Sequence, residues 1–292
     1  MPLTSLWLRF PVEKPVMFQS FSGFASRGIF FEMLKGYDSE MAFLLHSSGG
    51  IAPYSTTPLL AHDGRGLKII YRSLPACMAN LRICLLEHEL SKAFLEILIS
   101  DCPRIRLLDQ DIPLSSISVD VVNFQDFLKE ARPVRRFAVR FKTPCFFRRT
   151  PITAFLAFPS TLRLPPPLSV KRFYPLPEPV LMFRQLVRLW RTFSPKPFDY
   201  IRFLSWVEAG GIAISGFPRG LRTVRVYEHP DTNKWAVGFV GTVYFNLPED
   251  LYSKHHARTV DALLKFARYS NVGGNRTAGF GVIDYKPVEY EE

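Results

Sequence analysis

The sequence predicts an α+β fold of two tandem units, each with the order β-α-β-β-α-β of a ferredoxin-like, RRM-like domain. Two observations support this prediction. Segments with the alternating apolar pattern of strands and segments with helical spacing follow one another in this order in both halves of the chain. The 292 residues are also enough for two domains, and we expect a boundary between 1–127 and 128–292.

The first half begins with a predicted strand at 6–10, where alternate apolar residues share one face. A helix is expected next, because four residues recur at spacings of three or four: Phe24, Gly28, Phe31 and Lys35. A short second helix begins near Asp38 and Ser39, a favourable capping pair, and runs to about His46. The other predicted elements are strands at 67–72 and 81–87, a helix at 91–99, and extended segments at 105–108 and 112–121.

The second half begins with a strand that separates apolar and basic side chains. Phe137, Val139 and Phe141 face one way, while Arg136, Arg140 and Lys142 form a basic row on the other face. The proline-rich segment "LRLPPPLSVKRFYPLPEP" predicts an extended connection. The remaining predicted elements are a helix at 180–193, a hairpin of 222–227 and 235–245 around the turn "HPDTN", a helix at 252–268 and a last strand at 279–285.

The charge of the chain indicates a polyanionic partner. The formal net charge is +11 and the isoelectric point is near 9.6. Residues 131–150, "ARPVRRFAVRFKTPCFFRRT", hold seven Arg and Lys residues and no acid, and a second basic stretch lies at 184–196. The interleaved aromatic residues favour nucleic acid, because unstacked bases lie on rings while basic side chains hold the backbone. A solvated charged face or contact with an anionic membrane remains open.

The sequence predicts a cytoplasmic protein without a membrane span, a metal or another cofactor. No run reaches the roughly 18 apolar residues that a membrane helix needs, and the N-terminus lacks the pattern of a signal peptide. The four cysteines, Cys77, Cys84, Cys102 and Cys145, lack the spacings of zinc ligands or of a disulfide framework. We therefore expect them to be reduced packing residues.

A glycine-rich loop, "NVGGNRTAGFGVI" at 271–283, is typical of a phosphate-binding segment. It follows a predicted helix and precedes a strand, which is the reverse of the dinucleotide-binding order, and it lacks the Gly-Lys-Ser/Thr of a Walker loop. A simple left-handed helix cap and turn remains open. We expect a cradle for the phosphate backbone of a polymer, made by Gly273, Gly274, Asn275, Arg276, Thr277, Gly279 and Gly281.

Three segments carry a resemblance to a known family. Residues 238–283, with the helix, the glycine loop and the terminal Gly-Phe-Gly, resemble the C-terminal signature of the CRISPR-associated repeat-processing endoribonucleases, the Cas-six family of the RAMP superfamily. The segment "SRGIFFEMLKGYDSEMAFLLHSSGG" is similar to the family's first helices, and "VRFKTPCFFRR" is similar to the strand that opens its second domain. The Gly-Gly at 273–274 departs from the family's more frequent G-[IVF]-G.

The resemblance implies a metal-independent endoribonuclease that cleaves CRISPR precursor RNA within its repeats. The 2′-hydroxyl would attack the adjacent phosphate, leaving a 2′,3′-cyclic phosphate and a 5′-hydroxyl. His46 aligns with the catalytic histidine of archaeal members and would act as general acid or base, although a capping or packing histidine remains open.

Two positions depart from the family's catalytic pattern. Phe31 stands where some archaeal members carry a tyrosine, and Ala52 stands where they carry a lysine. We consider Arg27, Tyr54, Lys68 and Arg65 as replacements for the missing groups. The RNA-binding residues expected in the basic stretch are Arg136, Arg140, Lys142, Arg148 and Arg149.

Two other functions remain open on the sequence. A catalytically silent RAMP-type subunit that binds RNA in a CRISPR interference complex fits the departures at Phe31 and Ala52. A basic protein that binds DNA or a membrane surface fits the charge alone. Association with other effector subunits and formation of a homodimer are also left open.

Overall fold

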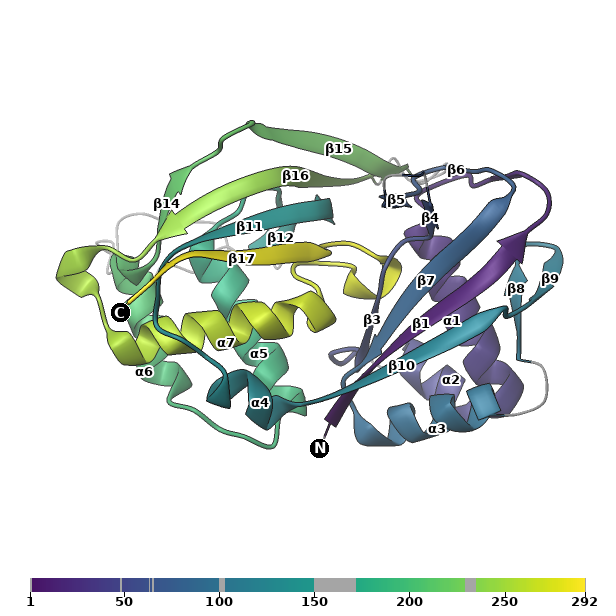
Figure 1. Cartoon of the computed structure of the whole chain (residues 1–292), viewed down its shortest axis with the longest axis horizontal. Helices are drawn as coiled ribbons and strands as arrows, with labels where there is room; N and C mark the ends of the chain where they lie inside the picture. Colours follow the sequence, from purple (N-terminus) through teal and green to yellow (C-terminus); the bar gives the residue numbers. More distant parts are fainter. Residues whose placement is uncertain are drawn as a thin grey trace, which may run out of the picture.

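The fold is described by a computed structural model that covers residues 2–47, 49–62, 64, 66–99, 103–149, 172–228 and 235–291 (Figure 1). Two antiparallel sheets lie side by side, and helices cover one face of each. Both sheets have the strand order fourth, first, third, second of a ferredoxin-like unit. The α+β prediction of two tandem ferredoxin-like units is therefore confirmed.

The first sheet is built on β1 (Pro2–Val12), which pairs with β10 (Ser116–Asn123) on one side and β7 (Cys77–Leu85) on the other. β3 (Tyr54–Thr56) and β4 (Leu60–His62) share the far edge of β7, and β5 (Leu67–Ile69) pairs with β4. The helices of this unit are α1 (Gly23–Tyr37), α2 (Ser39–Ser47) and α3 (His88–Ile99). Two small ribbons complete it, β2 (Val16–Met17) with β6 (Ser73–Leu74) and β8 (Arg104–Leu107) with β9 (Gln110–Pro113).

The second sheet has β11 (Val134–Cys145) between β16 (Trp235–Asn246) and β17 (Ile283–Tyr290). The other edge of β16 pairs with β14 (Ala213–Gly216) and β15 (Leu221–Glu228). The helices are α4 (Phe124–Lys129), α5 (Pro179–Phe193), α6 (Tyr200–Trp206), which continues into a π-helical turn at Val207–Gly211, and α7 (Lys254–Ser270). A ribbon of β12 (Phe147–Arg149) and β13 (Arg172–Tyr174) lies beside α5.

The amphipathic pattern predicted for β11 is confirmed. Phe137, Val139 and Phe141 are buried in the core of the second unit, while Arg136 and Arg140 are exposed on the opposite face. Successive side chains of a strand point to opposite faces of the sheet, and helices cover only one face here. Every second side chain from Phe137 to Phe141 is therefore apolar and buried between the sheet and the helices. The expected boundary at 127/128 falls within α4, whose Phe124 and Phe127 pack in the core of the second unit, and its position stays a prediction.

The buried face of α1 differs from the predicted one. The residues that the helix buries are Gly23, Ser26, Ile29, Phe30, Met33 and Leu34. Phe24 and Phe31, which belong to the predicted apolar stripe, are only half-buried. Phe24 contacts Phe280 of the glycine loop, and Phe31 contacts His46 of α2. Helical periodicity predicts a helix here, but it cannot separate core residues from residues at an interface.

The C-terminal strand also begins later than predicted, at Ile283 instead of 279. Gly279 and Gly281 have φ values of +71° and +64°, so the segment before Ile283 is a left-handed turn. The short elements α6 and β14 have no counterpart in the sequence-based prediction. The turn "HPDTN" and most of the proline-rich connection lie outside the described residues.

In the described ranges, no helix combines the length and apolar character needed to cross a bilayer. Cys77, Cys84 and Cys145 are free thiols, in agreement with their predicted packing role, and burial raises the pKa of each thiol. Cys102 lies outside the described residues.

Candidate functional site

His46 stands at the end of α2 against an aromatic residue of α1. Its ring centroid lies 5.4 Å from that of Phe31 in an edge-to-face arrangement, and its side chain is exposed. α2 begins where the backbone N–H of Met41 donates to the carboxylate of Asp38 at 2.9 Å, so the predicted cap is confirmed. α2 has nine residues, and His46 is in its last turn.

Tyr54 lies beneath Phe31. Its ring stacks on Phe30 with centroids 3.7 Å apart and meets the edge of Phe31 at 6.0 Å, and the residue is only 2% exposed. Burial raises the pKa of Tyr54 to about 12, although a hydrogen bond with Thr277 and the positive charge of Arg27 each lower it. Tyr54 is therefore neutral at physiological pH, and its burial argues against direct contact with a polymer.

Arg27 supplies a cation on the same side of α1 as Phe31, one turn earlier. Its guanidinium carbon is 5.5 Å from the centroid of the Phe24 ring, and its charge acts on Tyr54. Lys68 is remote from this cluster. Lys68 pairs with Ala61, which in turn pairs with Ala79 of β7, whereas Tyr54 pairs with Leu85 of the same strand. Ala79 and Leu85 are six residues apart, or about 20 Å along β7. The structure thus places Arg27, but not Lys68, close to Tyr54 and on the same side of α1 as Phe31. Arg65 lies outside the described residues.

A groove of about 750 Å³ runs between the two units next to this cluster. Residues Gly49–Ala52, which closely follow His46, form one wall, and α5, the β12–β13 ribbon and the glycine loop form the other. Its basic lining residues are Arg148, Arg184, Arg188 and Arg276. Arg184 is paired with Glu208 at 2.7 Å, and Glu178 is the one acid among the described residues of the lining. The groove is therefore a basic channel with His46 near its first-unit wall.

The glycine loop is shaped by close contacts within the protein. A Cβ on Gly281 would lie 1.6 Å from the carbonyl oxygen of Val272, and one on Gly279 would lie 2.4 Å from the nitrogen of Pro58. Gly274 faces the ring of Phe146 in the same way, at 2.2 Å. Packing between the loop and both units therefore requires glycine at these three positions.

Several backbone amides of the loop already have acceptors. The N–H of Gly274 donates to the carbonyl of Phe146 at 2.8 Å, and that of Gly281 donates to the carbonyl of Pro144 at 3.0 Å. The Gln185 side chain accepts from the N–H of Gly273 and donates to its carbonyl at 2.6 Å. No local pattern marks Gln185 as a partner of the loop, because Gly273 lies 88 residues further on.

Arg276 is buried, with 7% of its surface exposed. Its guanidinium donates to the carbonyls of Ser270 at 2.7 Å and Ala52 at 3.0 Å, and burial lowers the pKa of Arg276 to about 10. The side chain is charged at neutral pH, and its hydrogen bonds connect Ser270 of the second unit to Ala52 of the first. This placement argues against the expected phosphate contact by Arg276. Gly274, Asn275 and Thr277 are half-buried and line the groove, so they are the part of the predicted cradle that faces it.

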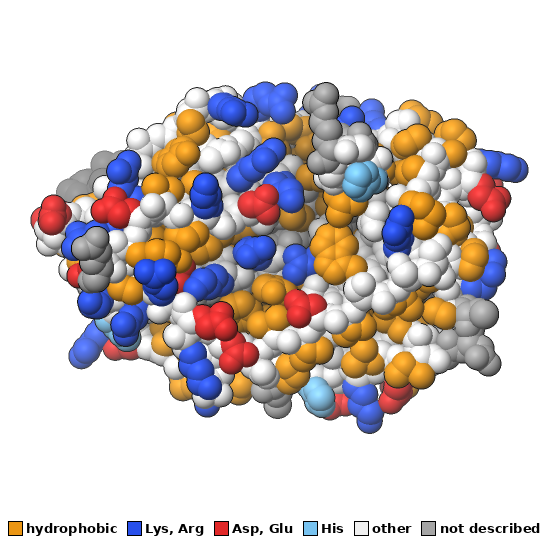
Figure 2. Space-filling view, viewed as in Figure 1, with side chains coloured by type: hydrophobic (Ala, Val, Ile, Leu, Met, Phe, Trp, Pro, Cys, Tyr) orange, Lys and Arg blue, Asp and Glu red, His pale blue; other side chains and the backbone are white. Residues whose placement is uncertain are grey.

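The basic row of β11 is partly neutralised by the last strand. Arg136 lies 3.8 Å from Glu289 and Lys142 lies 3.5 Å from Asp284, whereas Arg140 has no acidic partner in the described part of the chain. Figure 2 shows Lys and Arg side chains gathered over the second unit, with single acids between them. Arg148 lines the groove, and the side chain of Arg149 is not among those described.

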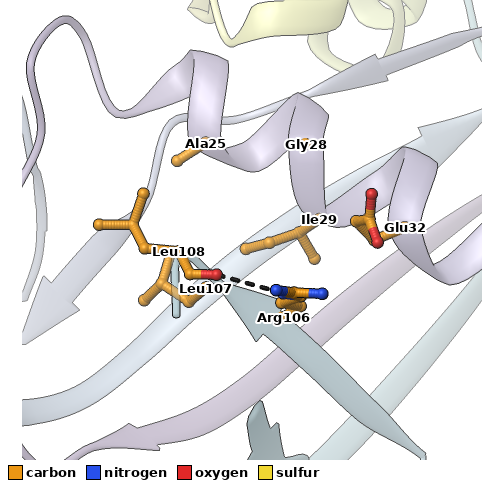
Figure 3. A pocket seen from close by; sticks show the side chains of 7 residues that line it. All are labelled: Ala25, Gly28, Ile29, Glu32, Arg106, Leu107 and Leu108. Carbon is orange, nitrogen blue, oxygen red and sulfur yellow. Dashed lines mark hydrogen bonds between the residues drawn. The ribbon is translucent and has the colours of Figure 1, made fainter. Parts of the chain in front are cut away.

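A second, smaller hollow lies between α1 and the β8–β9 ribbon (Figure 3). Ala25, Gly28, Ile29 and Glu32 form its helix side, and Arg106 donates to the carbonyl of Leu108 at 3.3 Å on the other. It contains none of the candidate catalytic side chains. Within the described ranges, no three His, Cys, Asp or Glu residues cluster closely enough to bind a metal ion.

The fold and the groove define a protein of two ferredoxin-like units with a basic channel between them, and comparison with known proteins identifies the family. Residues 139–283, about half of the chain, match the sequence model of the CRISPR-associated endoribonuclease Cas6 family. The chain belongs to the Cas6 family. A search of curated proteins gave no significant match.

Solved structures are similar over nearly the whole chain. A Thermus thermophilus Cas6 in a product complex has a TM-score of 0.75 and 22% identity, with 98% of this chain and 99% of that chain covered. A second Cas6 in complex with a substrate mimic has a TM-score of 0.64 and 20% identity, with 98% and 100% covered. A Cas6-related protein from Pyrococcus furiosus has a TM-score of 0.56 and 13% identity, with 99% and 100% covered. These likenesses support the fold.

Proposed function

We propose that the protein is a metal-independent endoribonuclease that cleaves CRISPR precursor RNA within its repeats. The observation that carries the proposal is the exposed His46 ring against Phe31, one helical turn from Arg27, with the residues that closely follow His46 lining a basic groove. The family match supports RNA cleavage as the reaction class. The product complex recorded for a similar Cas6 structure agrees with RNA processing by proteins of this fold.

The proposed reaction is an intramolecular transfer at phosphorus. The 2′-oxygen loses its proton and forms a bond to the neighbouring phosphorus, and the bond from phosphorus to the 5′-oxygen breaks. The 5′-oxygen takes up a proton, which leaves a 2′,3′-cyclic phosphate and a 5′-hydroxyl. We assign one of the two proton transfers to His46 and stabilisation of the developing phosphorane charge to Arg27. Phe31 and Tyr54 would form the apolar floor beneath these groups.

We assign RNA backbone binding to two basic surfaces. The groove offers Arg148, Arg184 and Arg188, and the open face of the second sheet offers Arg140 with the ion-paired Arg136 and Lys142. Such contacts release condensed counterions, so affinity should fall linearly with the logarithm of the salt concentration. Binding of other effector subunits and homodimer formation remain predictions.

A cleavage assay in excess EDTA tests the proposed activity. The purified protein and the repeat RNA of the host's own array are expected to give one cut, with a cyclic phosphate and a 5′-hydroxyl found by end-group analysis. His46→Ala should lower the single-turnover rate at least about 100-fold, because a general acid or base contributes roughly 10²- to 10⁴-fold. His62→Ala is the control, since His62 is an exposed histidine on the β4–β5 hairpin at the far end of β7. Uncut RNA under all conditions would refute the activity.

A catalytically silent RNA-binding subunit is the second candidate function. Phe31 and Ala52 lack the hydroxyl and the cation expected at these positions, and the hydroxyl of Tyr54 is buried. This function predicts tight, salt-dependent binding of repeat RNA with no cleavage above background. Preference for duplex DNA over repeat RNA in the same binding assay would contradict both functions.

A further inference from the structure

α2 exposes an aromatic ring close to His46. Phe43 is 70% exposed and Leu44 is 57% exposed, while Ala42 is the only residue of the helix that is buried. Leaving a Phe side chain in water forgoes roughly 1.5–3 kcal/mol of burial free energy. The core of the unit does not use Phe43, so its ring is available to a ligand.

The helix places Phe43 beside His46 and Leu44 away from it. Residues three apart on an α-helix are neighbours on its surface, with Cβ atoms roughly 5–6 Å apart. At 3.6 residues per turn, Phe43 and His46 differ in direction by about 60°, whereas Leu44 and His46 differ by about 160°. Because the His46 ring is also in contact with Phe31, the exposed ring of Phe43 borders the proposed site of cleavage.

We propose that Phe43 is a base-stacking residue of the RNA site, on which the unpaired base of a nucleotide next to the scissile phosphate lies. This inference rests on the proposed function and adds a specificity-determining contact to it. Stacking on one face of Phe43 fixes the position of the nucleoside, and therefore of its 2′-hydroxyl or 5′-oxygen, relative to His46. A ring can stack on any base, so the contact selects an unpaired nucleotide rather than a particular sequence.

The charges near the site favour an RNA base over an apolar protein partner. The groove wall at Gly49–Ala52 follows α2 directly, and Arg148, Arg184 and Arg188 line the same groove. An occupant that covers Phe43 and continues into the groove must combine an apolar planar surface with negative charge. Single-stranded RNA has both properties, because each nucleotide carries a flat base and a phosphate.

Binding measurements on uncleavable RNA test the stacking contact. The probe is the repeat RNA with a 2′-deoxynucleotide at the scissile position, and its dissociation constant is measured for the wild type, Phe43→Ala and Phe43→Tyr. Phe43→Ala should weaken binding about 5- to 150-fold, the range for loss of one base–aromatic stack, and Phe43→Tyr should restore it. Leu44→Ala is the matched control, since it removes another exposed apolar side chain of α2 from the side facing away from His46.

A second probe identifies the stacked base. RNAs with an abasic residue at each position flanking the scissile phosphate are bound to the wild type and to Phe43→Ala. At one position, the abasic RNA should bind both proteins equally, because neither the base nor the ring can then contribute. The inference is overturned if Phe43→Ala and the wild type bind intact RNA with equal affinity. It is also overturned if Phe43→Ala binds every abasic RNA more weakly than the wild type does.

The same experiment separates this inference from the proposed cleavage. The probe cannot be cut, so stacking on Phe43 is measured whether or not the protein is an enzyme. If wild type and Phe43→Ala bind one abasic RNA equally but native repeat RNA is never cleaved, the stacking contact is supported and the proposed activity is refuted. Unchanged RNA binding by Phe43→Ala with a change in native mass would assign the ring to a protein interface and refute the stacking contact.

Discussion

The guanidinium of Arg276 donates to the carbonyl of Ala52 at 3.0 Å, across 224 positions of the chain and from the second unit to the first. Asn271 makes a parallel contact, donating from its side chain to the carbonyl of Thr56 at 2.8 Å. The loop that contains both residues therefore joins the two units at the groove. Its basic residue Arg276 is buried and bonded to backbone carbonyls, whereas the exposed basic side chains of the groove and of the second sheet come from α5, β12 and β11.

Arg276→Ala should destabilise the protein. The substitution removes the donor from the buried carbonyl of Ser270 and from the partly buried carbonyl of Ala52. Hydrogen bonds of charged donors contribute roughly 1.5–3 kcal/mol each. We expect a loss of about 2–5 kcal/mol in the free energy of unfolding, measured by urea denaturation. Arg188→Ala, which removes an exposed groove residue, should leave stability unchanged within about 0.5 kcal/mol. Unchanged stability with weaker RNA binding in Arg276→Ala would restore its expected role as a phosphate ligand.

Gly281→Ala and Gly28→Ala should change stability in opposite directions. A Cβ at position 281 would overlap the Val272 carbonyl in a backbone conformation with φ of +64°, so we expect a loss above about 3 kcal/mol. Gly28 lies on the exposed side of α1 with nothing within 4 Å of an added Cβ, so alanine should stabilise the helix by roughly 0.5–1 kcal/mol. Thermal unfolding of the two variants measures both effects, and a tolerated Gly281→Ala would contradict the packing of the loop.

Tyr54 should make stability depend on pH in the alkaline range. Its pKa is about 12 in the folded protein and about 10 in an unfolded chain. Because the folded pKa is raised, the contribution is complete below pH 10 and is lost as pH rises from 10 to 12. Over that interval the wild type should lose up to about 3 kcal/mol more than Tyr54→Phe, measured by urea unfolding at each pH. Parallel curves for the two proteins would show that the Tyr54 hydroxyl reaches water.

Arg140→Ala should weaken RNA binding more than Arg136→Ala. Arg136 is paired with Glu289, whereas Arg140 has no acidic partner among the described residues. Removing one phosphate contact should reduce the slope of log affinity against log salt by about 1. Titrations at several salt concentrations measure the slope for both variants. Equal slopes in Arg140→Ala and the wild type would place the RNA away from the open face of the second sheet.

Local patterns in the sequence determined most of the fold. Alternation in β11, the cap at Asp38 and the helical spacing before Ile99 each depend on residues a few positions apart, and the structure contains the strand and helices that they predict. The ferredoxin-like order follows from the succession of these elements. The net positive charge is likewise a property of composition alone.

Only the tertiary structure decided the state of the individual site residues. Arg136 forms an ion pair with Glu289, and Gln185 forms hydrogen bonds with Gly273, although each pair is far apart in sequence. Tyr54 is likewise buried by segments that are distant from it along the chain. The sequence alone could identify Arg276 as a cation in a glycine-rich loop, but its role depends on the carbonyl that the other unit places beside it. A side chain's chemistry is local, whereas its burial, partners and access to a polymer arise when distant segments pack together.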